Sequence, residues 1–205
     1  GTVSTKAIAN GAGFLLLITV LAFFGWMFGA ASWTPVERTR LVAIAVLFFA
    51  ACVFWSLFEQ AGSSMNLFAQ RNTDNTIGKL TIPAPSYQSI NGFFIVTLAP
   101  AFAILWMKLG SREPSSPAKF AWGLGLVGLG FLVLASGASI AERGVRISPM
   151  WLLATYLLHT MGELCLSPVG LSAMTTLPPG RVGGHMMGVW FLSISIGNYL
   201  GGRIA

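Results

Sequence analysis

The stretch that decides the fold class is LVAIAVLFFAACVFWSLFEQ, residues 41–60, in which the first charged side chain is Glu59. An uncharged run of this length matches the roughly 20 residues that a helix needs to cross a bilayer. A strand of a membrane barrel would need only about 9–11 residues of alternating hydrophobicity. The run therefore predicts a transmembrane helix and an all-α protein.

The composition of the whole chain indicates the same class. Of the 205 residues, 55% are hydrophobic and only 9% are charged, and the mean hydropathy is +0.74. A water-soluble domain of this length would carry far more charge. The net charge of +6 comes from Lys and Arg residues between the apolar runs, so it indicates topology in a lipid bilayer and no nucleic-acid partner.

Six apolar runs have the length of transmembrane helices, so we predict a polytopic membrane protein with six spans. The first run ends at the turn signal SWTP, residues 32–35, and the second is longer than a hydrocarbon core of roughly 30 Å requires. The predicted helices comprise residues 11–31, 40–68, 87–107, 119–140, 149–175 and 185–205.

Basic residues are more frequent in loops one, three and five, and the positive-inside rule then places these loops in the cytoplasm. When Lys6 and Arg203, near the two ends of the chain, are included, the two sides of the membrane carry equal numbers of basic residues. The basic residues are Arg38, Arg40, Lys108, Arg112, Lys119 and Arg181 in the odd-numbered loops, and Arg71, Lys79, Arg143 and Arg146 in the even-numbered loops.

The two cysteines, Cys52 and Cys165, both lie within spans, where a free cysteine behaves as a small buried hydrophobe. They form neither a disulfide framework nor a metal site, and paired His or Cys ligands at coordinating spacing are absent from the sequence. We therefore expect no metal and no cofactor. Because the chain starts without Met and stops at Ala205, we also expect it to be a piece of a larger protein.

Glu59 and Glu163 are the leading candidates for a functional site because each lies deep inside a predicted span. An ionisable side chain at the bilayer centre costs roughly 2.5–3.5 kcal/mol on insertion scales, so such residues usually face a polar interior and take part in function. The alternative is that Glu59 only bonds to a neighbouring helix. On a continuous helix, Glu59 would lie on a polar stripe with Cys52, Trp55, Ser56, Gly62, Ser63 and Asn66.

Glu163 lies on a similar face of the fifth predicted helix, just before Pro168. Proline removes a helical hydrogen bond at the carbonyl of residue 164, so we expect a bend there, either static or mobile. His159 is a candidate proton relay or, alternatively, a satisfied interior residue. Tyr156, Thr160 and Ser167 lie within reach of the same face.

Polar or aromatic candidates also occur in the third and sixth spans. Asn91 follows Gln88 and Ser89 and can donate to a carboxylate or accept from an ammonium group. Trp190 and Ser193 lie one helical turn apart, although a tryptophan near a span end more often belongs to the interfacial belt. The glycines of the fourth and sixth spans predict close helix packing; they are Gly123, Gly125, Gly128, Gly130, Gly197 and Gly201.

A membrane-embedded hydrolase using His159 with Ser167 is a second hypothesis. The two residues are about 12 Å apart along a straight helix, and no nucleophile-elbow pattern occurs. We therefore expect that the protein is not an enzyme.

Four segments resemble the proton-dependent oligopeptide transporters of the major facilitator superfamily. FWSLFEQAGSS at 54–64 is similar to that family's seventh helix, and QSIN at 88–91 to the start of its eighth. GELCLSPVGLS at 162–172 resembles its tenth helix, and MMGVWFL at 186–192 its eleventh. Gly92, where many members have proline, departs from the pattern, as does Thr176, which stands at a commonly basic position.

The resemblance implies an incomplete carboxy-terminal half of such a transporter. Residues 1–36 would be an extra helix and linker between halves, and residues 37–205 the carboxy-terminal bundle without its last helix. The first helix, with its proton-coupling cluster, would lie in the missing amino-terminal half, together with the lysine and arginine partners of the two glutamates. The implied location is the inner (cytoplasmic) membrane.

The resemblance also implies symport of protons with di- and tripeptides by alternating access. Burial and a nearby cation act in opposite directions on the protonation of a carboxyl group, which would link peptide binding to proton binding. A carrier for another substrate, such as nitrate, is the remaining alternative. The implied substrate-binding residues are Trp55, Glu59, Asn91, Glu163, Trp190 and Ser193, with Glu59 and Glu163 also in proton coupling or gating.

Overall fold

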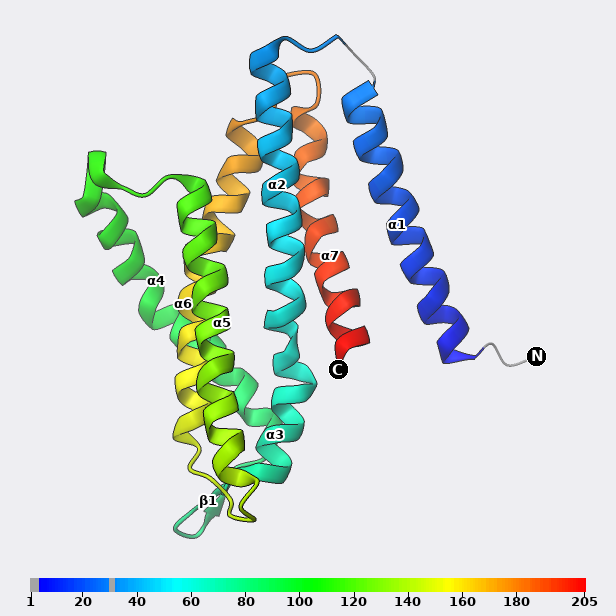
Figure 1. Cartoon of the computed structure of the whole chain (residues 1–205). Coiled ribbons are helices and arrows are strands. Elements are labelled where there is room, and N and C mark those ends of the chain that lie inside the picture. The colour runs from blue at the N-terminus through cyan, green and yellow to red at the C-terminus, as the bar shows by residue number, and fades with distance from the viewer. Residues whose placement is uncertain (1–3, 30–31) are drawn as a thin grey trace.

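The computed structural model describes residues 4–29 and 32–205 and is built almost entirely of helices (Figure 1). Two short strands form a hairpin at one end of the bundle. The longer helices are α1 (Thr5–Gly29), α2 (Pro35–Phe58), α3 (Ser64–Asn72), α4 (Ser89–Leu109), α5 (Ser116–Ala141), α6 (Met150–Thr176) and α7 (Met186–Ile204). The short elements are η1 (Glu59–Gly62), β1 (Thr76–Ile77), β2 (Leu80–Thr81), η2 (Ala84–Gln88), η3 (Gly110–Arg112) and η4 (Gly183–His185).

The predicted all-α class and the six-helix arrangement are confirmed. A long helix occupies each predicted position, although most ends shift by a few residues and the predicted end at Ala31 lies outside the described residues. Four helical segments of the described chain are long and apolar enough to cross a membrane by length and composition: Thr5–Gly29, Pro35–Asn72, Ala84–Arg112 and Ser116–Ala141. The chain is therefore a multi-pass membrane protein.

The prediction of one continuous helix over residues 40–68 is wrong. The helix begins earlier, at Pro35, because Thr34 and Glu37 form a capping box that satisfies the first backbone amides. It then tightens into the 3₁₀ turn η1 at Glu59 and resumes as α3 after Ser63, whose backbone (φ −122°, ψ −94°) is not helical. Glu59 therefore lies at a break in the helix.

Glycines allow the central helices to pack closely, as the sequence predicted for Gly123, Gly197 and Gly201. The same prediction is wrong for Gly125 and Gly128, where an added Cβ atom meets no described atom within 4 Å. A Cβ atom added at Gly123 of α5 would lie 3.0 Å from the carbonyl oxygen of Gly162 on α6. On α7, a Cβ atom at Gly197 would lie 3.0 Å from the carbonyl oxygen of Cys52, and one at Gly201 would lie 2.9 Å from that of Ser56. The α5–α6 and α2–α7 pairs are thus in backbone contact at these points.

The helices α1 and α4 lie at the periphery of the bundle. Figure 1 shows α1 beside α2 and α7, and α4 leaning away from α6 toward the end at which it joins α5. None of the α4 residues 89–109 is fully buried. Aromatic side chains connect α1 to the bundle, with the ring centroids of Phe24 and Phe48 5.1 Å apart.

Candidate functional site

A polar cluster joins α4 to α6 at Asn91. The Asn91 amide nitrogen Nδ2 donates a hydrogen bond to Glu163 Oε2 at 3.4 Å. The Thr160 hydroxyl oxygen lies 2.6 Å from Asn91 Oδ1 and 2.8 Å from the carbonyl oxygen of Tyr156, so its single proton is shared between two acceptors. The amide of Asn91 therefore connects the buried hydroxyl of Thr160 to the half-buried carboxyl group of Glu163.

The start of α4 is held in place by the segment before it. Tyr87, in the short turn η2, is buried and its hydroxyl donates to Asn75 Oδ1 at 3.0 Å. Asn75 in turn donates through Nδ2 to the carbonyl oxygen of Ala69 on α3 at 2.7 Å. These two bonds fix the approach of the chain to α4, and so the position of Asn91 one turn later.

A cavity of about 200 Å³ lies beside this cluster. The exposed side chain of Glu59 is on its wall, together with Asn91. The structure thus brings Glu59 and Asn91 to one cavity, and the Asn91 hydrogen bond places Glu163 beside it. The lining residues are Phe58, Glu59, Ala61, Gly62, Gln88, Asn91, Tyr156 and His159.

Gln60 holds the helix break that presents Glu59, a role that the sequence reasoning missed. Its Nε2 donates to the carbonyl oxygens of Ser56 and Gly201, at 3.3 and 2.9 Å. Its Oε1 accepts from the hydroxyls of Ser63 and Ser64, at 3.2 and 2.8 Å. A buried glutamine next to a glutamate in an apolar span was the available signal, because a buried amide requires several partners.

The predicted polar stripe on the second helix is divided between two environments. Cys52 and Ser56 are buried against α7, whereas Glu59 and Gly62 line the cavity beyond the helix break. Trp55 is half-buried, and its indole Nε1 is buried without a hydrogen-bond partner in the described chain. Only the end of the stripe therefore reaches the polar cluster.

Trp190 and Ser193 are buried away from the cavity. The Trp190 side chain is 3% exposed, with its ring centroid 6.5 Å from that of Phe120, and a Cβ atom at Gly170 would overlap it. The Ser193 hydroxyl is fully buried and donates to the carbonyl oxygen of Trp190 at 2.6 Å. The structure does not bring these two residues to Asn91, and ligand contacts by them stay predictions.

His159 and Ser167 do not form a nucleophile–base pair. His159 is 1% exposed and lies between aromatic rings, with its centroid 4.9 Å from that of Phe131 and 6.3 Å from that of Phe58. His159 Nε2 and Ser167 Oγ are both buried, and neither has a hydrogen-bond partner among the described residues. The hydrogen bond that would activate a serine is therefore not formed.

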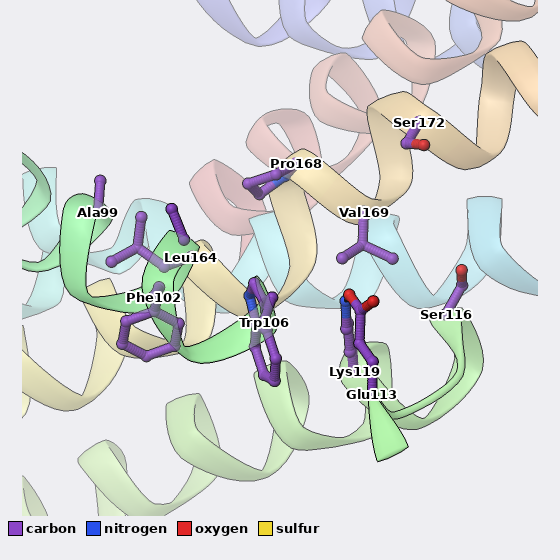
Figure 2. Close-up of a pocket in the computed structure, with 11 residues that line it drawn as sticks. Ala99, Phe102, Trp106, Glu113, Ser116, Lys119, Leu164, Pro168, Val169 and Ser172 are labelled. Atoms are coloured by element: carbon purple, nitrogen blue, oxygen red, sulfur yellow. The ribbon is translucent and has the colours of Figure 1, made fainter. Parts of the chain in front are cut away.

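A second cavity, of about 400 Å³, lies between α4, the start of α5 and the part of α6 around Pro168 (Figure 2). Lys119, which is 6% exposed, forms an ion pair with Glu113. Its Nζ also lies 4.4 Å from the centroid of the Trp106 ring. Figure 2 shows these side chains together on one wall, with Val169 on the opposite side. The sequence reasoning treated Lys119 as a helix start and as a basic residue of the third loop, and it missed this cluster.

Within residues 4–29 and 32–205, no group of three or more His, Cys, Asp or Glu side chains could hold a metal ion. The Asn91 cluster and the cavity beside it offer binding groups: the carboxyl groups of Glu163 and Glu59 can accept protons or a cationic amine, and the neutral amide of Asn91 can donate or accept hydrogen bonds. Half-buried carboxyl groups inside a helical membrane protein are typical of ion and substrate pathways.

These features define a class of protein: a polytopic helical membrane protein with titratable groups beside an internal cavity, as in secondary transporters. Residues 17–205 match the family model PTR2, and the chain belongs to the POT family. It is similar to the peptide transporter YePEPT of Yersinia enterocolitica, with 40% identity over 195 residues, which are 93% of this chain and 38% of that protein. It is also similar to dipeptide and tripeptide permease A of Escherichia coli, with 36% identity over 82% of this chain and 33% of that protein.

Solved structures show the same relationship. The crystal structure of a peptide transporter POT in complex with sulfate matches with a TM-score of 0.92 and 35% identity, over 98% of this chain and 41% of that one. A POT family transporter in complex with 5-aminolevulinic acid matches with a TM-score of 0.89 and 30% identity, over 99% of this chain and 42% of that one. The chain thus spans between one third and about two fifths of the length of these relatives.

Proposed function

We propose that this chain is the carboxy-terminal part of a transporter that carries di- and tripeptides together with protons across the inner membrane. The hydrogen bond from Asn91 to Glu163, beside a cavity that also contains Glu59, carries the proposal. A peptide ammonium group can pair with either carboxylate, and a proton can replace it there. The relatives named as peptide transporters and as di- and tripeptide permeases support the same substrate class.

The substrate pathway requires a second half of the protein. In major facilitator carriers the site lies between two six-helix halves, and alternating access arises when one half moves against the other. The exposed carboxyl group of Glu59 and the exposed length of α4 then face the amino-terminal half. In this proposal the amino-terminal half contributes a lysine that pairs with Glu163 and an arginine that pairs with Glu59. Residues 37–205 form the bundle that contacts the amino-terminal half.

The peripheral position of α1 is consistent with an added helix outside the transport bundle. Residues 1–36 would then connect the two halves without lining the peptide pathway. In the described part of the chain, α1 contacts the bundle through apolar side chains such as Phe24.

The direct test is Glu163→Gln in the full-length transporter, reconstituted in vesicles with an imposed pH gradient. The neutral amide keeps the shape of the side chain but cannot release a proton, so proton-driven accumulation of a dipeptide should be abolished. Counterflow exchange of labelled dipeptide, which needs no net proton movement, should persist. Undiminished accumulation would refute the proposed coupling.

The matched control is Glu142→Gln, which makes the same change at an exposed position in the connection between α5 and α6. Accumulation should remain at the wild-type level in this variant. Competition by nitrate, with no competition by dipeptides, would instead identify a carrier for an inorganic anion. Hydrolysis of the labelled dipeptide by the purified protein would favour the enzyme hypothesis.

A further inference from the structure

A third cavity, of about 490 Å³, opens at the hairpin end of the bundle, and its volume is within the range of small-molecule sites. Polar side chains from α3, the hairpin and the α5–α6 connection line it, and residues 82–85, which lead into η2, close one side. The residues used below are Asn66, Gln70, Asn75 and Arg146.

Arg146 supplies a free positive charge to this cavity. Its side chain is exposed, and in the described chain no acidic side chain lies within ion-pair distance of it. A guanidinium group presents several donors in a planar fork that matches a carboxylate. The cavity therefore offers a binding position for an anionic group.

Asn66 supplies the second observation. Its side-chain oxygen is buried and lacks a hydrogen-bond partner among the described residues. A buried acceptor without a donor is costly, and Asn66 is one of the residues that line this cavity. A ligand with N–H groups would satisfy it, whereas an inorganic anion would not.

The cavity also adjoins the Glu59 site along the chain. The Glu59 cavity is lined by η1 and the start of α4. The cavity described here is lined by α3 and by residues 82–85, which lead into η2, and these are the next segments toward the hairpin. This end lies on the outer side of the membrane if loops one, three and five are cytoplasmic, as their excess of basic residues over loops two and four predicts. A ligand bound here would thus lie on the entry side of the proposed pathway.

We propose that this cavity is an outer peptide-binding site, at which a short peptide binds before it reaches the Glu59 cavity. Arg146 binds the terminal carboxylate of the peptide, and the amides of Asn66 and Gln70 bind its backbone N–H and C=O groups. A peptide is the ligand class that combines an anionic end with N–H donors. This assignment rests on the proposed peptide transport and adds a second site to it.

The experiment measures uptake of Ala-Ala and of its carboxamide analogue by the full-length transporter in phosphatidylcholine vesicles, at a fixed pH gradient. Arg146→Gln should raise the KM for Ala-Ala roughly threefold to tenfold, the size expected for one exposed charge-assisted contact, with kcat changed less than about twofold. The KM for the carboxamide should change less than the KM for Ala-Ala. Asn66→Leu should raise the KM for both substrates, because both carry N–H donors.

Arg143→Gln is the matched control, because it removes the same charge from the same connection at a residue that does not line the cavity. It should behave like the wild type. An unchanged KM in Arg146→Gln, equal effects of the two arginine variants, or equal effects on both substrates would overturn the proposal. So would a defect in Arg146→Gln that appears only when anionic lipid is added, because the arginine would then bind lipid phosphate. If the wild type takes up neither substrate, the peptide-transport function itself fails, which is a separate outcome.

Discussion

Replacing Gly162 with alanine should force α5 and α6 apart. A Cβ atom at Gly162 would lie 2.8 Å from the carbonyl oxygen of Gly123 and 3.3 Å from Cγ2 of Val127. The first of these atoms belongs to a helix backbone and cannot rotate aside, so the two helices must separate by a few tenths of an ångström. Overpacking of this kind costs roughly 1–3 kcal/mol.

The intrinsic helix preference of alanine partly conceals this cost. Alanine is more favourable than glycine in a helix interior by about 1 kcal/mol, so Gly162→Ala should be destabilising by about 0–2 kcal/mol in net terms. Gly125 provides the matched control, because a Cβ atom there meets no described atom within 4 Å. Gly125→Ala should be neutral or stabilising by up to about 1 kcal/mol. The difference between the two variants, about 1–3 kcal/mol, isolates the clash.

The assay is the apparent melting temperature of the full-length protein in one detergent, followed by tryptophan fluorescence. At about 2–4 °C per kcal/mol for 150–250 residues, and less for a longer chain, Gly162→Ala should melt several degrees below Gly125→Ala. Equal melting temperatures would mean that the close approach of α5 and α6 does not exist in the protein. A lower value for Gly125→Ala would mean that α5 presents a different face to α6.

Three other substitutions test the contacts around the two cavities. Asn91→Ala removes the 3.4 Å hydrogen bond to Glu163 and should raise the KM for a dipeptide about fivefold, as measured by uptake at a fixed pH gradient. An unchanged KM would show that the Asn91 cluster does not take part in peptide binding. Gln60→Leu leaves several polar groups at the helix break unsatisfied and should destabilise the protein by about 1–3 kcal/mol in the same melting assay. A melting temperature equal to that of the wild type would contradict the hydrogen bonds of Gln60 described above. Glu113→Gln leaves Lys119 without its carboxylate and should lower the free energy of unfolding by about 1–2 kcal/mol. This value is smaller than for a fully buried ion pair because Glu113 is 41% exposed. No loss of thermal stability relative to Glu142→Gln would show that the pair is energetically neutral.

The fold was largely predictable, because the length of an apolar run is a local property of the sequence. Helices occur at all six predicted positions, and the packing role of Gly123, Gly197 and Gly201 is confirmed. The break at η1 was not predicted, because apolar periodicity continues through it. It depends on Gln60, whose amide bonds to Gly201, 141 residues further along the chain.

The candidate site was only partly predictable, for a related reason. Glu59 and Glu163 are conspicuous in the sequence because charge is rare in an apolar span. The contact of Asn91 with Glu163 connects residues 72 positions apart and depends on how α4 crosses α6. Spacing alone could not show that Trp190 packs on Gly170, because it does not reveal which neighbour covers each face of a helix.

By itself the sequence determined the membrane class, the approximate spans and the two carboxyl groups that lie within them, since transfer of apolar and charged groups into a bilayer depends on local composition. Only the tertiary structure decided that Glu59 lies at a helix break, that Asn91 connects Thr160 to Glu163, and that Lys119 pairs with Glu113 beside Trp106. These features arise from the relative positions of separate helices. Hydrogen bonds and ring contacts act over a few ångströms, so they depend on an arrangement that no single span specifies.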